Sequence, residues 1–474
     1  MRATLIAVSN YLHYGAVNMI GNLSILLFSS LFIFFLIFYL SRKSLEIDVL
    51  DVYIIFVLFH FGIYPFVRGL YFHKDLIFDF THSDPLVIGL VFAHVLLILI
   101  TLKILSIIFH KNMNYLKVNY LIERFYSVNQ YLILIFYSVA IIFVIFSYIQ
   151  YGVKTAITPD DFAKIGNQLP YWFTSFRTIY SCGTFCIYLV LLSYILKAKD
   201  YRHQTIWLAL TILFVPFAGI FGKRFYFEII IITIIFYVNY RKGLIFTWRN
   251  LIYGFALLAA LFLFSNLFQS YRGVLEHVGK VTSEEEKEIK NPLAAALNFQ
   301  STLPVLSVRP GTWEFSYLVF NKQIKDGITT SNGEIIVEGF KSAVPRYLWP
   351  QKKFGLIDDL LAKLYGVKPK DIDIGKNNFG VMQVEFGYLS LVIVPLLILA
   401  LLIMMNYINK MTNQYPIFLW LFSSNIIFYL INIEENGTDI FFMLRNIILF
   451  LGLFAIFIAS QRIYSIIGKK ILIR

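Results

Sequence analysis

The sequence predicts an all-α polytopic membrane protein with about eleven transmembrane helices and one large loop domain outside the membrane. Hydrophobic residues make up 58% of the 474 residues and charged residues only 15%, whereas soluble domains hold about 25% charged residues. The apolar residues also come in continuous runs of about twenty, the length that crosses a bilayer as a helix. A membrane β-barrel would show alternating apolar and polar residues instead.

About eight of the predicted spans precede residue 269. Each is an apolar run that ends where charged or polar residues begin, as the first does at Arg42-Lys43. A polar loop separates the fourth and fifth spans, and the tight turn Gly222-Lys223-Arg224 joins the sixth to the seventh. These spans are 24–40, 52–72, 85–109, 130–149, 172–196, 206–221, 226–240 and 251–268.

The segment 269–378 is too polar to cross a membrane. It contains the acidic run 283–288 and the tract Val344-Pro345-Arg346-Tyr347-Leu348-Trp349-Pro350. Irregular backbone finds no hydrogen-bond partners in hydrocarbon, so this segment is predicted to be a folded domain outside the membrane. Apolar residues at helical spacing over 356–364 predict an amphipathic helix. That helix either lies on the membrane surface or packs in the core of its own domain.

Three further spans, 384–405, 416–433 and 440–460, follow the long segment. The chain therefore divides into residues 1–268 with the first eight spans, the loop domain 269–378, and residues 379–474 with the last three spans and a tail. If the N-terminus lies outside, the basic clusters of the short loops and the tail fall on one side. The positive-inside rule makes that side cytoplasmic and the large loop external.

Composition argues against several other classes. The net charge of +13 is explained by basic cytoplasmic loops, and without a basic stripe in a soluble domain we expect no nucleic-acid partner. Cys182 and Cys186 lack nearby histidines, so they do not indicate a zinc site. Neither a phosphate-binding loop nor a dinucleotide fingerprint is present, so nucleotide use is not indicated. No cleavable signal peptide is expected.

Several basic residues fall on the external side, against the positive-inside trend. A charge within the membrane costs about 2.5–3.5 kcal/mol on insertion scales and is a functional candidate by default. The plainer explanation for any one of them is snorkelling to head groups or pairing with a nearby carboxylate. Several arginines together suit a lipid-linked diphosphate, because guanidinium groups bind phosphate oxygens in pairs. The candidates are Arg177, Lys223, Arg224, Arg272 and Arg445.

Carboxylates on the same side are candidates for a general base. Glu385 lies at the start of the ninth span, and Glu434-Glu435 lie before the eleventh. Partial burial at a membrane edge raises a carboxyl pKa, which suits a base, although one of these groups could instead pair with Arg445. His277 is a second kind of base candidate. Side chains that could hydrogen-bond sugar hydroxyls are Gln383, Tyr388 and Tyr317.

Asp371-Ile372-Asp373 has the Asp-x-Asp spacing by which some glycosyltransferases hold a divalent cation. No further carboxylate or histidine follows closely to complete a coordination shell. We therefore predict no metal and no other cofactor, and the plainer reading of the tract is a solvated loop among lysines.

The tract Val344-Pro345-Arg346-Tyr347-Leu348-Trp349-Pro350-Gln351-Lys352 resembles the Wzy-type polymerases of bacterial surface polysaccharides, a family that includes the O-antigen and enterobacterial common antigen polymerases. Shorter matches follow in the family's order along most of the chain. They are Gly222-Lys223-Arg224, Tyr271-Arg272-Gly273, Asn378-Phe379-Gly380, Glu385-Phe386-Gly387-Tyr388, Glu434-Glu435-Asn436-Gly437 and Arg445. In the O-antigen polymerase pattern an Arg is followed eleven residues later by a Gly. None of Arg272, Arg309 and Arg346 is followed in that way. The identity of the general base is therefore left open.

The resemblance implies a GT-C-like fold and a polymerase at the periplasmic face of the bacterial inner membrane. It would join undecaprenyl-diphosphate-linked glycans, a donor and an acceptor, by inverting transfer without a metal. Arg177, Arg224 and Arg272 would bind the diphosphates, with Lys223 and Arg445 beside them. Arg346, Trp349 and Tyr388 would contact sugar or phosphate, and Glu385 or Glu435 would be the base. Whether a chain-length regulator binds is left open.

Two other functions use similar residues. A flippase or transporter for lipid-linked glycans also needs external arginines, but it would usually show internal repeats, and none is visible. An O-antigen ligase would use the same fold on another acceptor. The lipid-linked product distinguishes a polymerase from a flippase and a ligase, because only a polymerase extends one repeat unit into a ladder of longer products.

Overall fold

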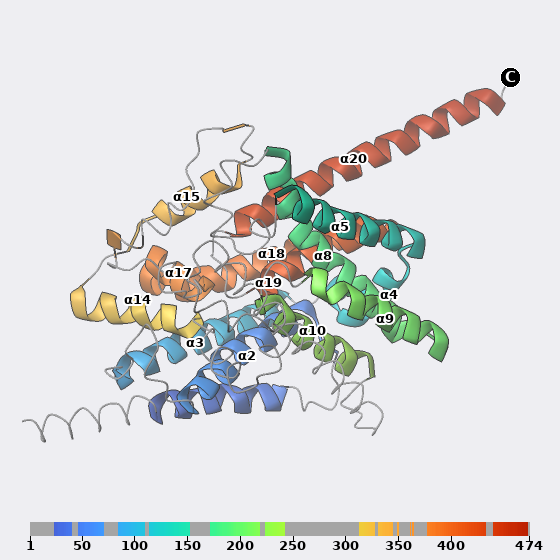
Figure 1. The fold of residues 1–474 in the computed structure, drawn as a ribbon. Helices are drawn as coiled ribbons and strands as arrows, with labels where there is room; N and C mark the ends of the chain where they lie inside the picture. The colour runs from blue at the N-terminus through green and yellow to red at the C-terminus, as the bar shows by residue number, and fades with distance from the viewer. Residues whose placement is uncertain are drawn as a thin grey trace, which may run out of the picture.

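The computed structural model describes residues 23–39, 46–70, 84–109, 113–151, 171–218, 223–241, 312–327, 330–344, 348–349, 361, 363–364, 377–432 and 439–472. Within these residues the chain is a bundle of helices with no β-sheet (Figure 1). The predicted all-α class is confirmed.

Most helices lie within a few residues of a predicted span, because an apolar run ends where residues that need water begin. The first is Leu23–Tyr39. The others are α2 (Val49–Leu70), α3 (Pro85–Phe109), η3 (Asn114–Leu116), α4 (Val118–Tyr126), α5 (Gln130–Tyr151), α8 (Tyr171–Lys197), α9 (Tyr201–Ala218), α10 (Lys223–Arg241), α14 (Thr312–Asp326), α15 (Glu334–Ala343), α17 (Asn378–Phe386), η6 (Gly387–Leu389), α18 (Ser390–Thr412), α19 (Pro416–Ile431) and α20 (Asp439–Leu472).

Three described helical segments are long and apolar enough to cross a membrane: Pro85–Phe109, Asn378–Thr412 and Ile440–Gln461. A fourth span is possible if α4 and α5, which meet at 89°, are counted together. Several shorter helices are also strongly apolar. A membrane protein is therefore supported, while the count of about eleven spans stays a prediction. The predicted span 251–268 lies outside the described residues.

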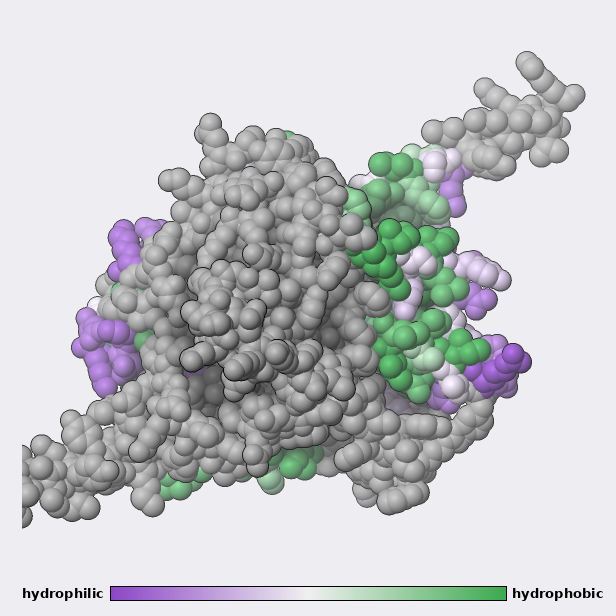
Figure 2. All heavy atoms as spheres, in the orientation of Figure 1, coloured by the Kyte–Doolittle hydropathy of each residue, from purple (hydrophilic) through white to green (hydrophobic). Residues whose placement is uncertain are grey.

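The outer surface of the bundle carries many large apolar side chains. They lie on the first helix, α3, α5, α18 and α20, and Figure 2 shows apolar residues gathered on the right of the view, over α5 and the middle of α20. Soluble monomers rarely expose contiguous apolar patches larger than a few hundred Å². This surface is compatible with a membrane protein.

Helix α19 lies at the centre of the bundle, in contact with α2, α4, α8, α18 and α20. Most of its side chains are buried, and the indole nitrogen of Trp420 donates to the carbonyl oxygen of Cys186 in α8 at 2.7 Å. Cys186 is thus a buried packing residue with a free thiol.

One end of the bundle, here called the basic end, gathers the start of α2 and the ends of α3, α8, α10 and α18. Ile47 donates its amide to Asn239 Oδ1 of α10 at 2.9 Å, and Val118 donates to the carbonyl of Ile47 at 3.0 Å. Helix α4 packs here, where the sequence predicted only a basic loop. Its apolar residues Val118, Leu121, Ile122 and Phe125 are all buried.

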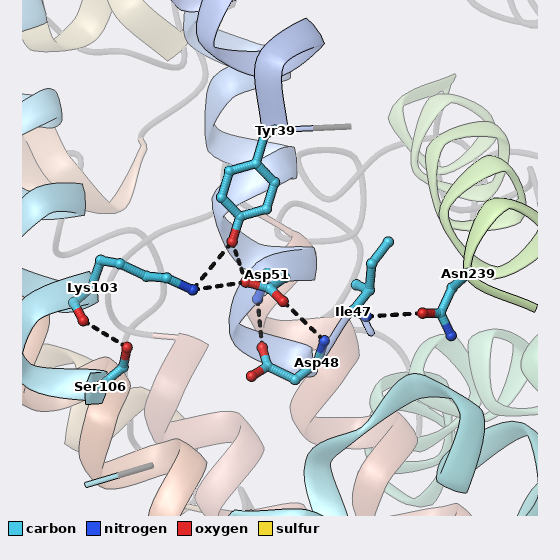
Figure 3. A network of polar contacts seen from close by, with 7 residues as sticks. All are labelled: Tyr39, Ile47, Asp48, Asp51, Lys103, Ser106 and Asn239. Atoms are coloured by element: carbon cyan, nitrogen blue, oxygen red, sulfur yellow. Dashed lines mark hydrogen bonds and ion pairs between the residues drawn. The ribbon is translucent and has the colours of Figure 1, made fainter. Parts of the chain in front are cut away.

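A polar network ties three helices together at the basic end (Figure 3). Asp48 and Asp51 form a reciprocal cap on α2: Asp51 N donates to Asp48 Oδ1 at 2.8 Å, and Asp48 N donates to Asp51 Oδ2 at 3.1 Å. Lys103 of α3 lies 3.0 Å from Asp51 Oδ1, and the Tyr39 hydroxyl donates to the same oxygen. The lysine of an apolar helix is therefore neutralised by the cap of its neighbour.

The opposite end, here called the site end, holds the starts of α3, α18 and α20 together with α14, α15 and α17. Helix α14, which the sequence places in the loop domain, contributes Trp313, Tyr317 and Phe320 to the main core. A second small core forms from Phe315, Val319, Ile335, Leu361, Val381 and Val384. The described part of the long segment thus packs directly on the transmembrane helices.

Candidate functional site

A break in the ninth span organises the site end. The sequence predicted one span over 384–405, but the chain forms α17, a turn of 3₁₀ helix at η6, and then α18. Gly387 sits at the break with a φ of +55°, a conformation that a residue without Cβ adopts easily. A Cβ there would also lie 3.2 Å from Thr330 Cγ2. Two predicted site residues, Glu385 and Tyr388, flank this glycine.

Glu385 lies in α17 and is 2% exposed. Its carboxylate accepts hydrogen bonds from the amides of Ile335 and Ile336, both at 3.3 Å, and from the Ser331 hydroxyl. Those amides belong to the first turn of α15, whose N–H groups have no partner within the helix. The carboxylate therefore caps α15 from a different helix, in the place where the helix dipole favours negative charge.

Arg445 lies partly buried in α20. Its Nη1 is 3.5 Å from the carbonyl oxygen of Ala343, the last residue of α15, and its Nη2 is 3.3 Å from Asn446 Oδ1. The guanidinium carbon also stands 5.2 Å from the centre of the Phe442 ring. Among the described residues no carboxylate lies within ion-pair distance of this guanidinium.

Helix α15 is thus held by complementary charges, with Glu385 at its N-terminus and Arg445 at its C-terminus. The helix has ten residues, so these two groups are separated by about 15 Å. Glu385 is therefore not the ion-pair partner of Arg445. Arg346 follows Ala343 by three residues in the sequence, directly after the end that Arg445 holds.

The polar contacts of Arg445 continue into the centre of the bundle. The amide of Asn446 is 3.5 Å from Asn425 Oδ1 in α19, and Asn425 donates to the Met443 carbonyl at 3.3 Å. Both asparagines are buried. Buried amides between membrane helices stabilise one relative position of the helices, because each group needs its partner away from water.

A second buried network at the site end was not predicted. His94 Nε2 of α3 lies 2.8 Å from the Ser390 hydroxyl, which is 3.0 Å from Gln383 Oε1. Gln383 in turn donates to Gln323 of α14 at 2.9 Å. This chain joins α3, α18, α17 and α14 around the break. A histidine inside the apolar run 85–109 was the one available signal, since such a residue normally has a partner.

Two residues proposed to bind sugar hydroxyls are occupied by contacts within the protein. Gln383 is fully buried in the network just described. Tyr317 is buried and accepts a hydrogen bond from the amide of Asp84 at 2.8 Å. Burial raises the pKa of Tyr317 above its ordinary value, so the phenol stays neutral at physiological pH. Tyr388, in contrast, is 65% exposed and free to contact a ligand.

The remaining predicted site residues are described only in part. Trp349 is 40% exposed. Lys223 and Arg224 are the first two residues of α10, not members of a turn, and Arg177 lies in the first half of α8. Outside the described residues lie Arg272, Arg346, Glu434, Glu435, His277, Asp371 and Asp373.

The described residues of 356–364 favour one of the two predicted alternatives. Leu361 is buried in the second core, and Leu364 packs against it. This fits a helix segment that packs inside its own domain better than one lying on the membrane surface. Leu356 and Leu360 lie outside the described residues.

Comparison with protein-family models, with curated proteins and with solved structures found no match to this chain.

Proposed function

We propose that this protein is a polymerase that joins undecaprenyl-diphosphate-linked repeat units into a surface polysaccharide at the outer face of the bacterial inner membrane. The observation that carries the proposal is Arg445. It is a partly buried guanidinium in the first turns of an apolar helix, and its described partners are a carbonyl, an amide and an aromatic ring. A group of this kind is suited to a phosphate anion.

In the proposed reaction, a sugar hydroxyl of the acceptor attacks the anomeric carbon of the donor glycan. The bond from that carbon to the diphosphate oxygen breaks, and undecaprenyl diphosphate leaves with the bonding electrons. The proton of the hydroxyl passes to a carboxylate. Arginines that stabilise the negative charge on the leaving diphosphate lower the barrier where no metal does so.

The contacts of Glu385 support Glu435 as the base. Glu385 is 2% exposed, and both of its oxygens accept hydrogen bonds from α15 or its preceding turn, whereas a base must lie within reach of the substrate proton. Glu435 lies outside the described residues and comes ten residues before Arg445 in the sequence. We therefore assign Glu385 a positioning role and Glu435 the proton transfer.

The test is reconstitution of the purified protein into vesicles with one synthetic lipid-linked repeat unit and no nucleotide sugar. A ladder of lipid-linked products is expected, and Arg224→Ala should abolish it without unfolding the protein. Arg202→Ala provides a matched control, because Arg202 is an exposed arginine near the start of α9, at the basic end.

Other outcomes would overturn the proposal. An intact repeat unit that has crossed the bilayer would identify a flippase. Transfer of the glycan to a different acceptor, with no extension of the lipid-linked unit, would identify a ligase. A normal ladder from Arg224→Ala would leave the proposed activity in place and would remove only Arg224 from the proposed site.

A further inference from the structure

Helix α15 presents apolar side chains on its outer face. Val337 and Phe340, three residues apart on one side of the helix, are 50% and 60% exposed. Ile335 and Ala343, on the inner face, are buried. The exposed Glu334 and the half-buried Lys341, which pairs with Glu338 at 2.5 Å, lie on the flank of this face. The exposed side of α15 therefore has an apolar face beside a charged one, as an amphipathic helix at a membrane surface has.

Contacts with α20 place the C-terminal half of α15 at the level of the membrane. The Phe340 ring packs edge-on against Phe441, with ring centres 6.0 Å apart, and Arg445 holds the carbonyl of Ala343. The apolar span of α20 runs from Ile440 to Gln461. Phe441 and Arg445 therefore stand only about 1.5 and 7.5 Å along the helix axis from the start of that span.

Contacts with α17 place the N-terminal half of α15 at the same level of the membrane. Ser331 donates its amide to the Val384 carbonyl at 2.9 Å, beside the cap formed by Glu385. Directly after Gly387 come two exposed apolar residues, Leu389 at the end of η6 and Val392 in α18. Both ends of α15 thus lie where the lipid-facing surfaces of the neighbouring helices begin.

We propose that α15 is an interfacial helix, with Val337 and Phe340 inserted among the lipids of the leaflet at the site end. Helices of this kind bury their apolar face about 5–10 Å into the boundary of head groups and acyl chains. The exposed residues Leu348 and Trp349 follow α15, and tryptophan is enriched at this level of a membrane. The inference does not depend on the proposed polymerase activity.

Lipid is a better occupant of this face than a second copy of the chain. Two partly exposed side chains offer an area on the order of 200 Å², whereas a stable protein interface needs about 800 Å² from each partner. On the neighbouring α20, Phe441 contacts Phe340, and the exposed Ile448 lies about two turns further along that helix.

The experiment places single cysteines in a background with Cys182→Ala and Cys186→Ala. Val337→Cys and Phe340→Cys test the helix, Leu396→Cys on the exposed face of α18 is the lipid control, and Lys325→Cys at the exposed end of α14 is the water control. Each is labelled with an environment-sensitive nitrobenzoxadiazole dye. The labelled proteins are placed in phosphatidylcholine nanodiscs whose lipids are brominated either high or low on the acyl chain.

Labels at 337 and 340 are expected to emit at shorter wavelength than the label at 325 and to be quenched most by lipids brominated high on the chain. The label at 396 should be quenched more by lipids brominated low on the chain. Emission and quenching at 337 and 340 equal to those at 325 would overturn the inference. So would blue-shifted emission without lipid quenching, since that would mean a protein surface covers the face. Thermal unfolding of each variant, compared with the cysteine-free parent, identifies any that fail to fold.

Discussion

At the scale of single residues, the site end depends on charges that act on backbone groups. Glu385 binds amides at the beginning of α15, and Arg445 binds the carbonyl at its end. Neither residue lies near α15 in the sequence. The same two side chains that the sequence marked as functional candidates therefore also fix the helix that precedes the Val344–Trp349 tract.

Replacing Glu385 should loosen α15 without unfolding the bundle. Glu385→Ala leaves the buried amide of Ile335, the part-buried amide of Ile336 and the Ser331 hydroxyl without their acceptor, at a cost of about 1–3 kcal/mol for a buried group. Hydrogen exchange of residues 334–343 is expected to become faster, while exchange in α3 stays unchanged. Glu385→Gln, which keeps an acceptor oxygen, should have a smaller effect.

The same pair of variants separates a positioning role from catalysis. If Glu385 were the base, Glu385→Gln would eliminate chain extension while exchange of α15 remained as slow as in the parent protein. That result would contradict the assignment to Glu435.

Arg445 is expected to speed glycosyl transfer because its planar guanidinium can bind two phosphate oxygens of the leaving group. A hydrogen bond to a charged group contributes about 1.5–3 kcal/mol, so Arg445→Ala is expected to slow chain extension by about 10–100-fold. Arg445→Lys keeps the charge but cannot bind two phosphate oxygens in the planar fork, so it should restore only part of the rate. Rates with the synthetic lipid-linked unit measure both effects, with Arg202→Ala as the control. A rate in Arg445→Ala equal to that of Arg202→Ala would show that Arg445 does not bind the leaving group.

At the scale of elements, α14 and α17 run side by side in the same direction. Ser316 contacts Asn377 at 3.1 Å near the start of both helices, and Gln323 contacts Gln383 at 2.9 Å further along. Gly380 allows this close approach, because a Cβ there would lie 2.5 Å from a ring carbon of Phe315.

Gly380→Ala should therefore destabilise the contact between α14 and α17. Forcing an extra methyl into a packed core costs about 1–3 kcal/mol. The expected result is a lower unfolding temperature. It can be measured by the reaction of a thiol dye with Cys186, which is buried in the folded protein. Gly452→Ala in α20 is the matched control, since nothing lies within 4 Å of a Cβ at that position. Equal unfolding temperatures for the two variants would show that α14 and α17 can accommodate the extra methyl group without loss of stability.

At the scale of the whole molecule, the bundle has two ends of different chemistry. The basic end joins its helices through compact ion pairs and caps, such as Lys103 with Asp51. The site end instead has a broken helix, two buried polar networks and a short helix held by charge at both ends. The proposed reaction belongs at the second end, where Arg445 and the exposed Tyr388 lie.

Chain extension is expected to survive removal of divalent cations. The proposed mechanism stabilises the leaving diphosphate with arginines, so product ladders formed in EDTA should match those formed without it. Loss of the ladder in EDTA, restored by Mg²⁺, would contradict the mechanism. That result would direct attention to Asp371 and Asp373.

The sequence alone determined the class of the protein and the position of most helices. The predicted span 85–109 coincides with α3. The predicted span 416–433 begins at the same residue as α19 and ends two residues later. These features are local, because the length of an apolar run and the polar residues that end it are both visible along the chain. The sequence also identified Glu385 and Arg445 as residues that needed an explanation.

Only the tertiary structure decided what those residues contact. Glu385 and Ile335 are fifty residues apart, and Arg445 and Ala343 are 102 residues apart. The network of His94, Ser390 and Gln383 likewise joins separate helices. No periodicity along the chain encodes such pairs. Each forms because packing removes the two groups from water in the same place, and a buried polar group must then find its partner there.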